Sequence, residues 1–146
     1  MEVGIKKLKQ EAVLPKYATD GSGCFDFFCI EDFNIGPRYS YTVSTGLAFE
    51  IPKDHVMLLF SRSGHGFKDD LRLANCVGVI DSDYRGELKI KVTSDSNHKW
   101  RYFKRGDRIA QGMVIKFDKV VFKELEELSE TDRGEGGFGS TDRTTL

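Results

Sequence analysis

The sequence has little of what marks a membrane, secreted or nucleic-acid-binding chain. Its longest apolar run covers only residues 56–60, whereas a membrane-spanning helix needs about 20 apolar residues. Residues 1–6 lack the apolar segment of a signal peptide. The 22 basic and 23 acidic side chains leave a net charge of -1, so no basic excess drives general binding to nucleic acids or membranes. We expect neither as a partner.

Cysteine and histidine are also scarce. The three cysteines, Cys24, Cys29 and Cys76, are odd in number and fit no zinc-binding spacing. The three histidines show no metal-ligand spacing either. These counts predict reduced, mostly buried thiols, and with them a location in the cytoplasm, or in the host cytoplasm if the source is a virus.

What the sequence does have is enough length for one core and a dominant period of two. A chain of 146 residues is one ordinary domain and buries roughly 70% of its unfolded surface. Leu88, Ile90 and Val92 alternate with polar residues, as in a strand with one buried face. Many short strands separated by turns predict an all-β sandwich or barrel. Strands are expected over residues 25–30, 39–43, 47–51, 55–60, 88–92, 99–103 and 109–117, with turns at 34–37, 51–54, 94–97 and 104–107.

The C-terminal part of the sequence departs from this pattern. Val121, Leu125 and Leu128 have helical spacing among charged residues, but the all-β context favours an extended connector almost equally, so both alternatives stay open. From Thr131 onward glycine and small polar residues dominate, as in a mobile arm. We therefore predict one β-rich domain over residues 1–130 and a flexible arm over 131–146.

Two segments carry residues suited to phosphate chemistry. Residues 62–64, Arg-Ser-Gly, follow the apolar run, where a cation, a hydroxyl and free backbone N–H groups can form an anion site. The segment 78–86 places Asp81 and Asp83, with a tyrosine and an arginine, between two glycines. Two Asp at i and i+2 lie on the same side of an extended strand, where a water or hydrated cation would offset their repulsion. A solvated turn is the alternative.

The arm carries a third such segment. Residues 134–139 have the form GxGxxG, but no βαβ unit surrounds them, so a dinucleotide-binding fold is excluded. Glycines still let successive backbone N–H groups converge on an anion, and Arg133 adds a permanent positive charge. Phe138 is the one aromatic side chain in the arm, and it either tucks the tail onto the core or stacks on a planar base.

Five segments occur in the order in which the trimeric deoxyuridine triphosphatases (dUTPases) carry their five motifs, and the chain closely resembles that family over almost its whole length. The resemblance implies a jelly-roll-like β-barrel and a homotrimer with three active sites at subunit interfaces. The arm of one chain would close a site built by the others. The segments lie at residues 18–26, 62–64, 78–86, 106–111 and 133–141.

The resemblance also implies an activity. The family hydrolyses dUTP to dUMP and pyrophosphate, with Mg2+ bound to the triphosphate. This reaction limits uracil incorporation into DNA and supplies dUMP for thymidylate synthesis.

Roles follow from the resemblance position by position. Asp81 is the expected general base for the water that attacks the α-phosphorus, Tyr84 packs on the deoxyribose, and Asn75 pairs with the uracil edge. Asp26 contacts Mg2+ through water only, since Mg2+ keeps several waters. The other expected substrate contacts are Val79, Ile80 and Lys89 at the base, Arg62, Ser63, Gly64 and Gln111 at the phosphates, and Arg133, Phe138, Gly139, Ser140 and Thr141 in the closing arm.

The sequence departs from the family pattern at three places. Gly23-Cys24 replaces the usual Ala-Gly, Ser61 a common Pro, and His65 a usual Leu. None of these changes removes a group with an expected chemical role. We expect His65 to pack in the core or at an interface rather than to act in catalysis.

Two other functions were weighed. A dCTP deaminase has a related fold, but the intact segment 81–86 and the complete arm favour a dUTPase. A regulatory protein that binds nucleotide and signals through a partner would keep the pocket, whereas the retained Asp81 and Gln111 favour an active enzyme.

Overall fold

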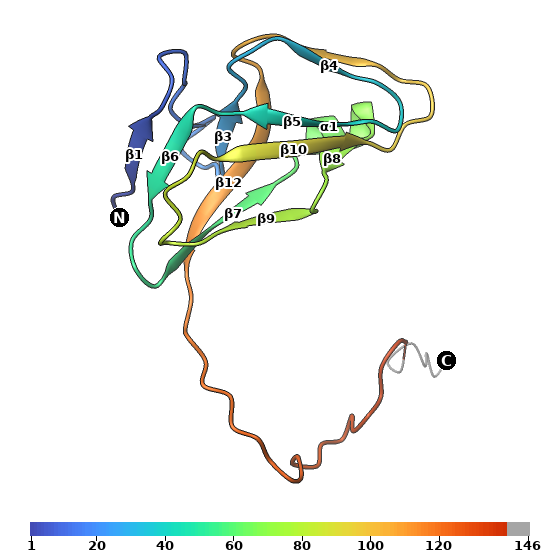
Figure 1. The fold of residues 1–146 in the computed structure, drawn as a ribbon. Coiled ribbons are helices and arrows are strands. Elements are labelled where there is room, and N and C mark those ends of the chain that lie inside the picture. The colour runs from blue at the N-terminus through green and yellow to red at the C-terminus, as the bar shows by residue number, and fades with distance from the viewer. Residues whose placement is uncertain (140–146) are drawn as a thin grey trace.

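The computed structural model describes residues 1–139, which form a β fold with a long C-terminal extension (Figure 1). The only helix in this part of the chain has seven residues, so the all-β prediction is confirmed. The elements are β1 (Gly4–Lys7), β2 (Lys16–Tyr17), β3 (Phe25–Phe28), β4 (Phe33–Ile35), β5 (Ser40–Ser44), β6 (Leu47–Glu50), β7 (His55–Phe60), α1 (Ser63–Asp69), β8 (Leu71–Leu73), β9 (Val77–Ile80), β10 (Lys89–Ser94), β11 (Arg101–Phe103) and β12 (Arg108–Lys116).

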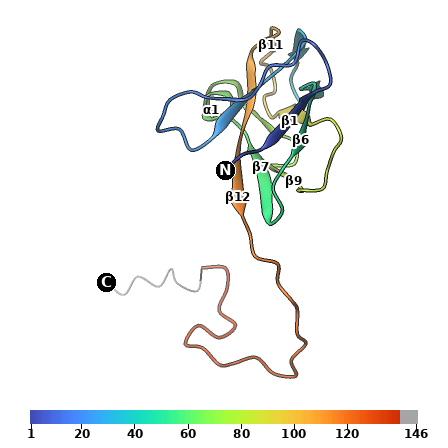
Figure 2. The ribbon, with the colours of Figure 1, turned by 90° about the vertical axis from the view of Figure 1, so that its left-hand side faces the viewer.

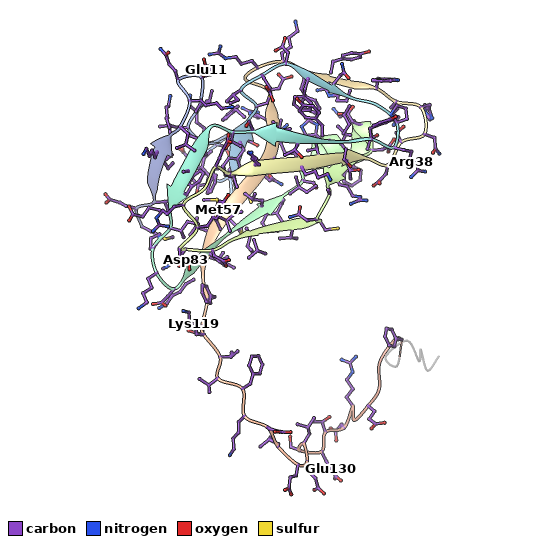
Figure 3. All side chains as sticks on the ribbon, viewed as in Figure 1. Glu11, Arg38, Met57, Asp83, Lys119 and Glu130 are labelled. Atoms are coloured by element: carbon purple, nitrogen blue, oxygen red, sulfur yellow. The ribbon has the colours of Figure 1, made fainter. Side chains whose placement is uncertain are left out.

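The strands form antiparallel sheets around one apolar core. The largest sheet has the order β2-β3-β12-β7-β9, and a second has the order β5-β10-β8. Two smaller sheets pair β1 with β6 and β11 with β4. Phe27 and Met57 of the largest sheet and Val43 of the second sheet are fully buried, and Figure 3 shows Met57 inside the fold. This arrangement agrees with the expected jelly-roll-like barrel.

Several expected strands are confirmed closely. β7 covers the residues 55–60 that the apolar run predicts. In β10, Ile90 and Val92 are buried while Lys89 and Lys91 are exposed, as the period of two requires.

Other expectations were wrong. The turn expected at 34–37 includes β4, in which Ile35 is buried and pairs with Arg101 of β11. The strand expected at 39–43 begins only at Ser40, and Tyr39 is exposed. Residues 63–69 form a short helix, for which the sequence pattern carried no expectation. At β4 and β5, pairing with the distant strands β11 and β10 overrides the local pattern.

The chain leaves the barrel at the end of β12 and runs away from it in both views (Figures 1 and 2). Residues 121–130 contain no helix, and the side chains of Val121 and Leu128 are 95% and 84% exposed. The extended connector is therefore the alternative that the structure adopts. The boundary between domain and arm at residue 130 stays a prediction.

Two whole-chain expectations concern the thiols and the membrane. Cys24, Cys29 and Cys76 are all free, but only Cys29 is buried, so the prediction of mostly buried thiols is wrong. Among residues 1–139, no helix combines the length and the apolarity that crossing a bilayer requires.

Candidate active site

A groove lies between β9 and β10, two strands that follow each other in sequence but do not pair. β9 bonds only to β7, and β10 bonds to β5 and β8. The edge of β9 that faces away from β7 therefore presents backbone donors and acceptors, as any edge strand does. Two adjoining hollows of about 410 and 360 Å³ share Val79, Ile80 and Lys89 as lining residues.

The groove brings together most of the expected nucleoside contacts. Asn75 lines the larger hollow, Asp81 and Tyr84 line the smaller one, and the three shared residues connect them. A planar base needs such a narrow site with a few placed polar groups.

The segment after β9 is a turn rather than an extended strand. The backbone N–H of Tyr84 donates to the backbone carbonyl oxygen of Asp81 at 3.2 Å. The guanidinium of Arg85 donates to the backbone carbonyl oxygen of Ser82 at 2.7 Å. Of the two alternatives for Asp81 and Asp83, the solvated turn is therefore the one that the structure adopts, and not the shared face of a strand. Both carboxylates are exposed, and Asp83 lies at the end of the barrel from which the arm leaves (Figure 3). Asp81 therefore lines the smaller hollow of the groove, and Asp83 does not.

Glu87 is a groove residue that the sequence reasoning missed. It lines the smaller hollow, and its Oε1 accepts from the hydroxyl of Ser44 at 2.8 Å and from the N–H of Gly46 at 2.9 Å. Burial by itself would raise the pKa of Glu87, but these two bonds and the charges of Lys9 and Lys89 bring it below its usual value. Its position directly after the glycine of the 78–86 segment was the available signal.

A second cluster forms where β3, β12 and β7 lie side by side. Gln111 of β12 stands opposite both Asp26 of β3 and Phe60 of β7. Asp26 is 7% exposed, and its two oxygens accept from Nε of Arg62 at 3.0 Å and from Nε of Arg108 at 3.2 Å. Arg108 is a further member that the sequence reasoning did not single out, although it lies within the 106–111 segment.

The expected phosphate loop enters this cluster as the start of α1. Arg62 is the extended N-cap residue, and Ser63 and Gly64 form the exposed first turn. The first N–H groups of a helix have no acceptor within the helix, so those of Ser63 and Gly64 can bind an anion. The side-chain amide of Gln111 donates to the backbone carbonyl oxygen of Ser61 at 3.0 Å, and this bond connects the loop to β12.

Two of the three departures from the family pattern, Ser61 and Cys24, have local contacts that the structure shows. The hydroxyl of Ser61 accepts from the N–H of Leu73 at 2.9 Å, a bond that proline cannot make. Burial, and next the charge of Asp26, raise the pKa of the Cys24 thiol, which lowers the fraction present as thiolate.

The chain offers no direct ligand set for a metal ion among its described residues. No three His, Cys, Asp or Glu side chains gather there, and both oxygens of Asp26 are engaged by arginines. A carboxylate keeps further lone pairs that can accept from water. The residues present therefore fit an ion that takes its inner ligands from substrate and water.

The expected arm residues lie apart from both clusters. Arg133 donates from Nε to the oxygen of Gly136 at 2.8 Å, within the arm itself. Phe138 is fully exposed and has a positive φ of 34°, so the alternative in which it packs on the core of its own chain is not what the structure adopts. Gly139 is the last described residue, and Ser140 and Thr141 lie outside the described residues.

The expected site residues thus form three separate groups in one chain. None of Asp26, Arg62 and Gln111 lines the groove. In the described range, no hydrogen bond or ion pair between side chains joins the groove residue Asp81 or the arm residue Arg133 to that cluster. No single group contains the expected contacts to the base, to the phosphates and from the closing arm together.

Comparison with known proteins finds one consistent set of relatives. The family model for dUTPase matches residues 10–142. The deoxyuridine 5'-triphosphate nucleotidohydrolase of Nautilia profundicola is 44% identical, over 97% of this chain and 99% of its own. That of Helicobacter hepaticus is 43% identical, over 97% of this chain and 89% of its own.

Solved structures agree with this result. A mutant of the Staphylococcus bacteriophage 80alpha dUTPase, with dUpNHpp, has a TM-score of 0.87 at 28% identity, over 96% of this chain and 98% of that one. A mutant dUTPase of phage phi11, which coordinates a structural Mg(II) ion, has a TM-score of 0.80 at 22% identity, over 87% of this chain and 98% of that one.

Proposed function

The chain belongs to the dUTPase family, and we propose that it hydrolyses dUTP to dUMP and pyrophosphate through the three groups of residues described above. In the cell this activity limits uracil in DNA and supplies dUMP for thymidylate synthesis. The observation that carries the proposal is the groove between β9 and β10, which gathers Asn75, Ile80, Asp81, Tyr84 and Lys89.

The groove provides the means to select the base. The unpaired edge of β9 at Val79 and Ile80 offers backbone groups to the polar edge of uracil, and the amide of Asn75 supplies both a donor and an acceptor. A thymine methyl would have to enter a slot that side chains of β9 and β10 already line. Steric exclusion of added bulk is what this design requires.

The sugar is selected by Tyr84. Its hydroxyl donates to the backbone oxygen of Glu87 at 3.0 Å, which fixes the ring above the turn. A ring held in this place packs on the deoxyribose and leaves no room for a 2′-hydroxyl.

Asp81 acts as the general base. Its exposed carboxylate stands at the mouth of the groove and takes a proton from a water molecule. The oxygen of that water forms a bond to the α-phosphorus, the bond from phosphorus to the bridging oxygen breaks, and pyrophosphate leaves. Asp83 supports the turn.

The phosphates bind at the second cluster. Arg62 supplies a guanidinium, Ser63 and Gly64 supply backbone N–H groups, and Gln111 lies beside them. Asp26 orients Arg62 and would accept hydrogen bonds from water molecules bound to Mg2+. Mg2+ bound to the triphosphate would neutralise charge on the phosphates when present.

We also propose that the active enzyme is a homotrimer with shared sites. The groups stand apart within one chain, and the arm extends away from its own barrel (Figure 2). The groove of one copy, the phosphate cluster of a second and Arg133, Phe138, Gly139, Ser140 and Thr141 from the arm of a third would complete each site. An elution mass of about three times 16.5 kDa is expected, and a monomer mass would contradict the proposal.

A substrate panel tests the activity. With Mg2+ present, pyrophosphate release is measured from dUTP, dTTP, dCTP and UTP, with ammonia release from dCTP as a parallel readout. Clear preference for dUTP supports the proposal. Ammonia release would instead support a deaminase, and nucleotide binding without turnover would support a regulatory protein.

Subunit mixing tests the shared site. Asp81→Asn and Arg62→Ala are each expected to be inactive alone. If the two residues reach one site from different chains, mixed trimers contain some sites with both wild-type residues and regain part of the activity. No recovery after verified subunit exchange would place both residues in a site formed by a single chain.

The cytoplasmic location remains part of this proposal. It rests on the reduced state of the three cysteines, all of which are free.

A further inference from the structure

His65, the residue that replaces a usual leucine of the family, is buried beside the phosphate cluster. It lies in the first turn of α1, directly after Ser63 and Gly64, and is only 7% exposed. Its ring packs against that of Phe103, with centroids 5.3 Å apart. An apolar side chain would satisfy this packing equally well, so the ring nitrogens call for a separate explanation.

One ring nitrogen bonds to the backbone of β12. Nε2 of His65 lies 2.8 Å from the oxygen of Arg108, and because a carbonyl oxygen only accepts, Nε2 carries the hydrogen and donates it. β7 ends at Phe60, opposite Gln111, so α1 rather than a strand adjoins Arg108 on that side. The ladder on the other side is irregular between Arg108 and Ala110. His65 thus adds a hydrogen bond to β12 on the side where β7 does not pair with Arg108.

The same ring limits the position of Arg62. Nη1 of Arg62 is 3.4 Å from Nε2 of His65, while Nε of Arg62 donates to Asp26 at 3.0 Å. Because Nε2 has no free lone pair for Arg62, this contact is packing rather than a hydrogen bond. The guanidinium is therefore held by Asp26 and bounded by His65. Nδ1 of His65 faces the carboxylate of Asp69 at 3.5 Å, one turn further along α1.

The helix itself needs such an anchor. α1 has seven residues, two of them glycines, and its N-cap residue Arg62 makes no side-chain capping bond. An isolated helix of this length is unstable in water, so tertiary contacts decide where its first turn stands.

We infer that His65 is a positioning residue of the phosphate site, which fixes the first turn of α1 against β12 through its bond to Arg108. The inference rests on the proposed function, since it assumes that residues 62–64 bind the phosphates. It assigns His65 no contact with the reacting atoms. Its loss should weaken phosphate binding and leave the chemistry at Asp81 nearly unchanged.

Two substitutions at one position test the inference in the full-length protein. His65→Leu keeps apolar bulk against Phe103 but removes the bond, whereas His65→Gln places an amide nitrogen at a similar reach. Loss of one hydrogen bond should raise KM for dUTP and the Kd for pyrophosphate roughly fivefold in His65→Leu, with kcat nearly unchanged. His65→Gln should recover most of the affinity. Deoxyuridine, which has no phosphate, should bind all three proteins alike.

A matched control is available at His55, whose Nδ1 lies 3.1 Å from the backbone oxygen of Lys53. His55→Leu removes a similar bond at the end of β7 that is remote from α1 and should leave pyrophosphate binding unchanged. A merely structural role for His65 would lower the melting temperature and the active fraction without moving KM. Unchanged affinities in His65→Leu, or equal losses in His65→Gln, overturn the inference.

Two further outcomes are decisive. If His65→Leu does not fold, His65→Asn replaces it, because an asparagine amide is too short to reach Arg108 while glutamine is not. If the wild-type chain binds pyrophosphate but does not cleave dUTP, the proposed function fails while the affinities of the variants still decide the role of His65. A wild-type chain that binds no pyrophosphate overturns the inference.

Discussion

The hydroxyl of Tyr84 donates to the backbone oxygen of Glu87 at 3.0 Å, and the ring lies so close to Gly86 that a Cβ there would stand 2.5 Å from the hydroxyl oxygen. The glycine is required by this contact between a side chain and the backbone, since its own φ is not positive. Tyr84 and Glu87 thereby fix the ring over the groove.

Gly86→Ala is expected to displace the Tyr84 ring. Because Tyr84 is 46% exposed, the ring can swing outward, so stability should change little while selection against UTP weakens roughly tenfold. The ratio of kcat/KM for dUTP and UTP measures this. Gly66→Ala in α1, where nothing lies closer than 3.9 Å to the new Cβ, is the control and should keep the wild-type ratio.

Asp81→Asn is expected to stop the chemistry while binding persists. Removing a general base costs about 10²- to 10⁴-fold in kcat, and the exposed position of Asp81 implies no loss of stability. Single-turnover rates and the Kd of a nonhydrolysable dUTP analogue measure the two effects. A kcat within about threefold of the wild type would show that Asp81 is not the general base.

Glu87 should make the fold sensitive to acid. Its pKa in the folded protein is lowered from 4.5, so the unfolded chain binds the proton first as the pH falls. The stabilisation is then fully present above the unfolded pKa and is lost as the pH falls through the folded pKa. Glu87→Gln should flatten this acid limb in a series of urea titrations between pH 7 and pH 3. An unaltered limb would show that other carboxylates produce it.

Asp26→Asn is expected to destabilise the protein. The change leaves Arg62 and Arg108 without their common counter-charge, and because both arginines partly reach water, the free energy of unfolding should fall by about 2 kcal/mol. Asp95→Asn, which breaks the exposed pair with Arg72 (2.7 Å), is the control and should lose less. Equal losses in urea unfolding would contradict a special role for the buried carboxylate.

A chain that ends at Thr131 should fold normally and work poorly. Residues 118–139 make no hydrogen bond or ion pair with the barrel in the described part of the chain, so the melting temperature should stay within about 2 °C of the wild type. The kcat/KM for dUTP should fall at least about tenfold, because the arm can no longer close over the bound substrate.

Phe138→Ala should reproduce part of this loss. Phe122→Ala, which removes another exposed ring from the extended chain between β12 and the arm, should not. Wild-type activity in the truncated chain would exclude a closing role for the arm.

Patterns local to the sequence predicted a large part of the molecule. The alternation of Ile90 and Val92 with lysines is complete within one strand, and it predicts β10 without knowledge of any partner. The order of the five segments likewise needs no structure, and it identified the family and, through the resemblance, the expected groove residues. Glu87 was missed because its bonds to Ser44 and Gly46, which lie 43 and 41 residues earlier, form only in the fold.

Only the tertiary structure decided the contacts between distant segments. Asp26 meets Arg62 and Arg108 because β3, β12 and β7 are neighbours in the sheet, and no local pattern encodes that order. α1 contains two glycines and forms where β7 stops, at a place where His65 can bond to β12. Propensity over a few residues is weaker than the burial and hydrogen bonds that pairing supplies, so the sequence by itself determined the family and most of the strands, and the fold decided which distant residues meet.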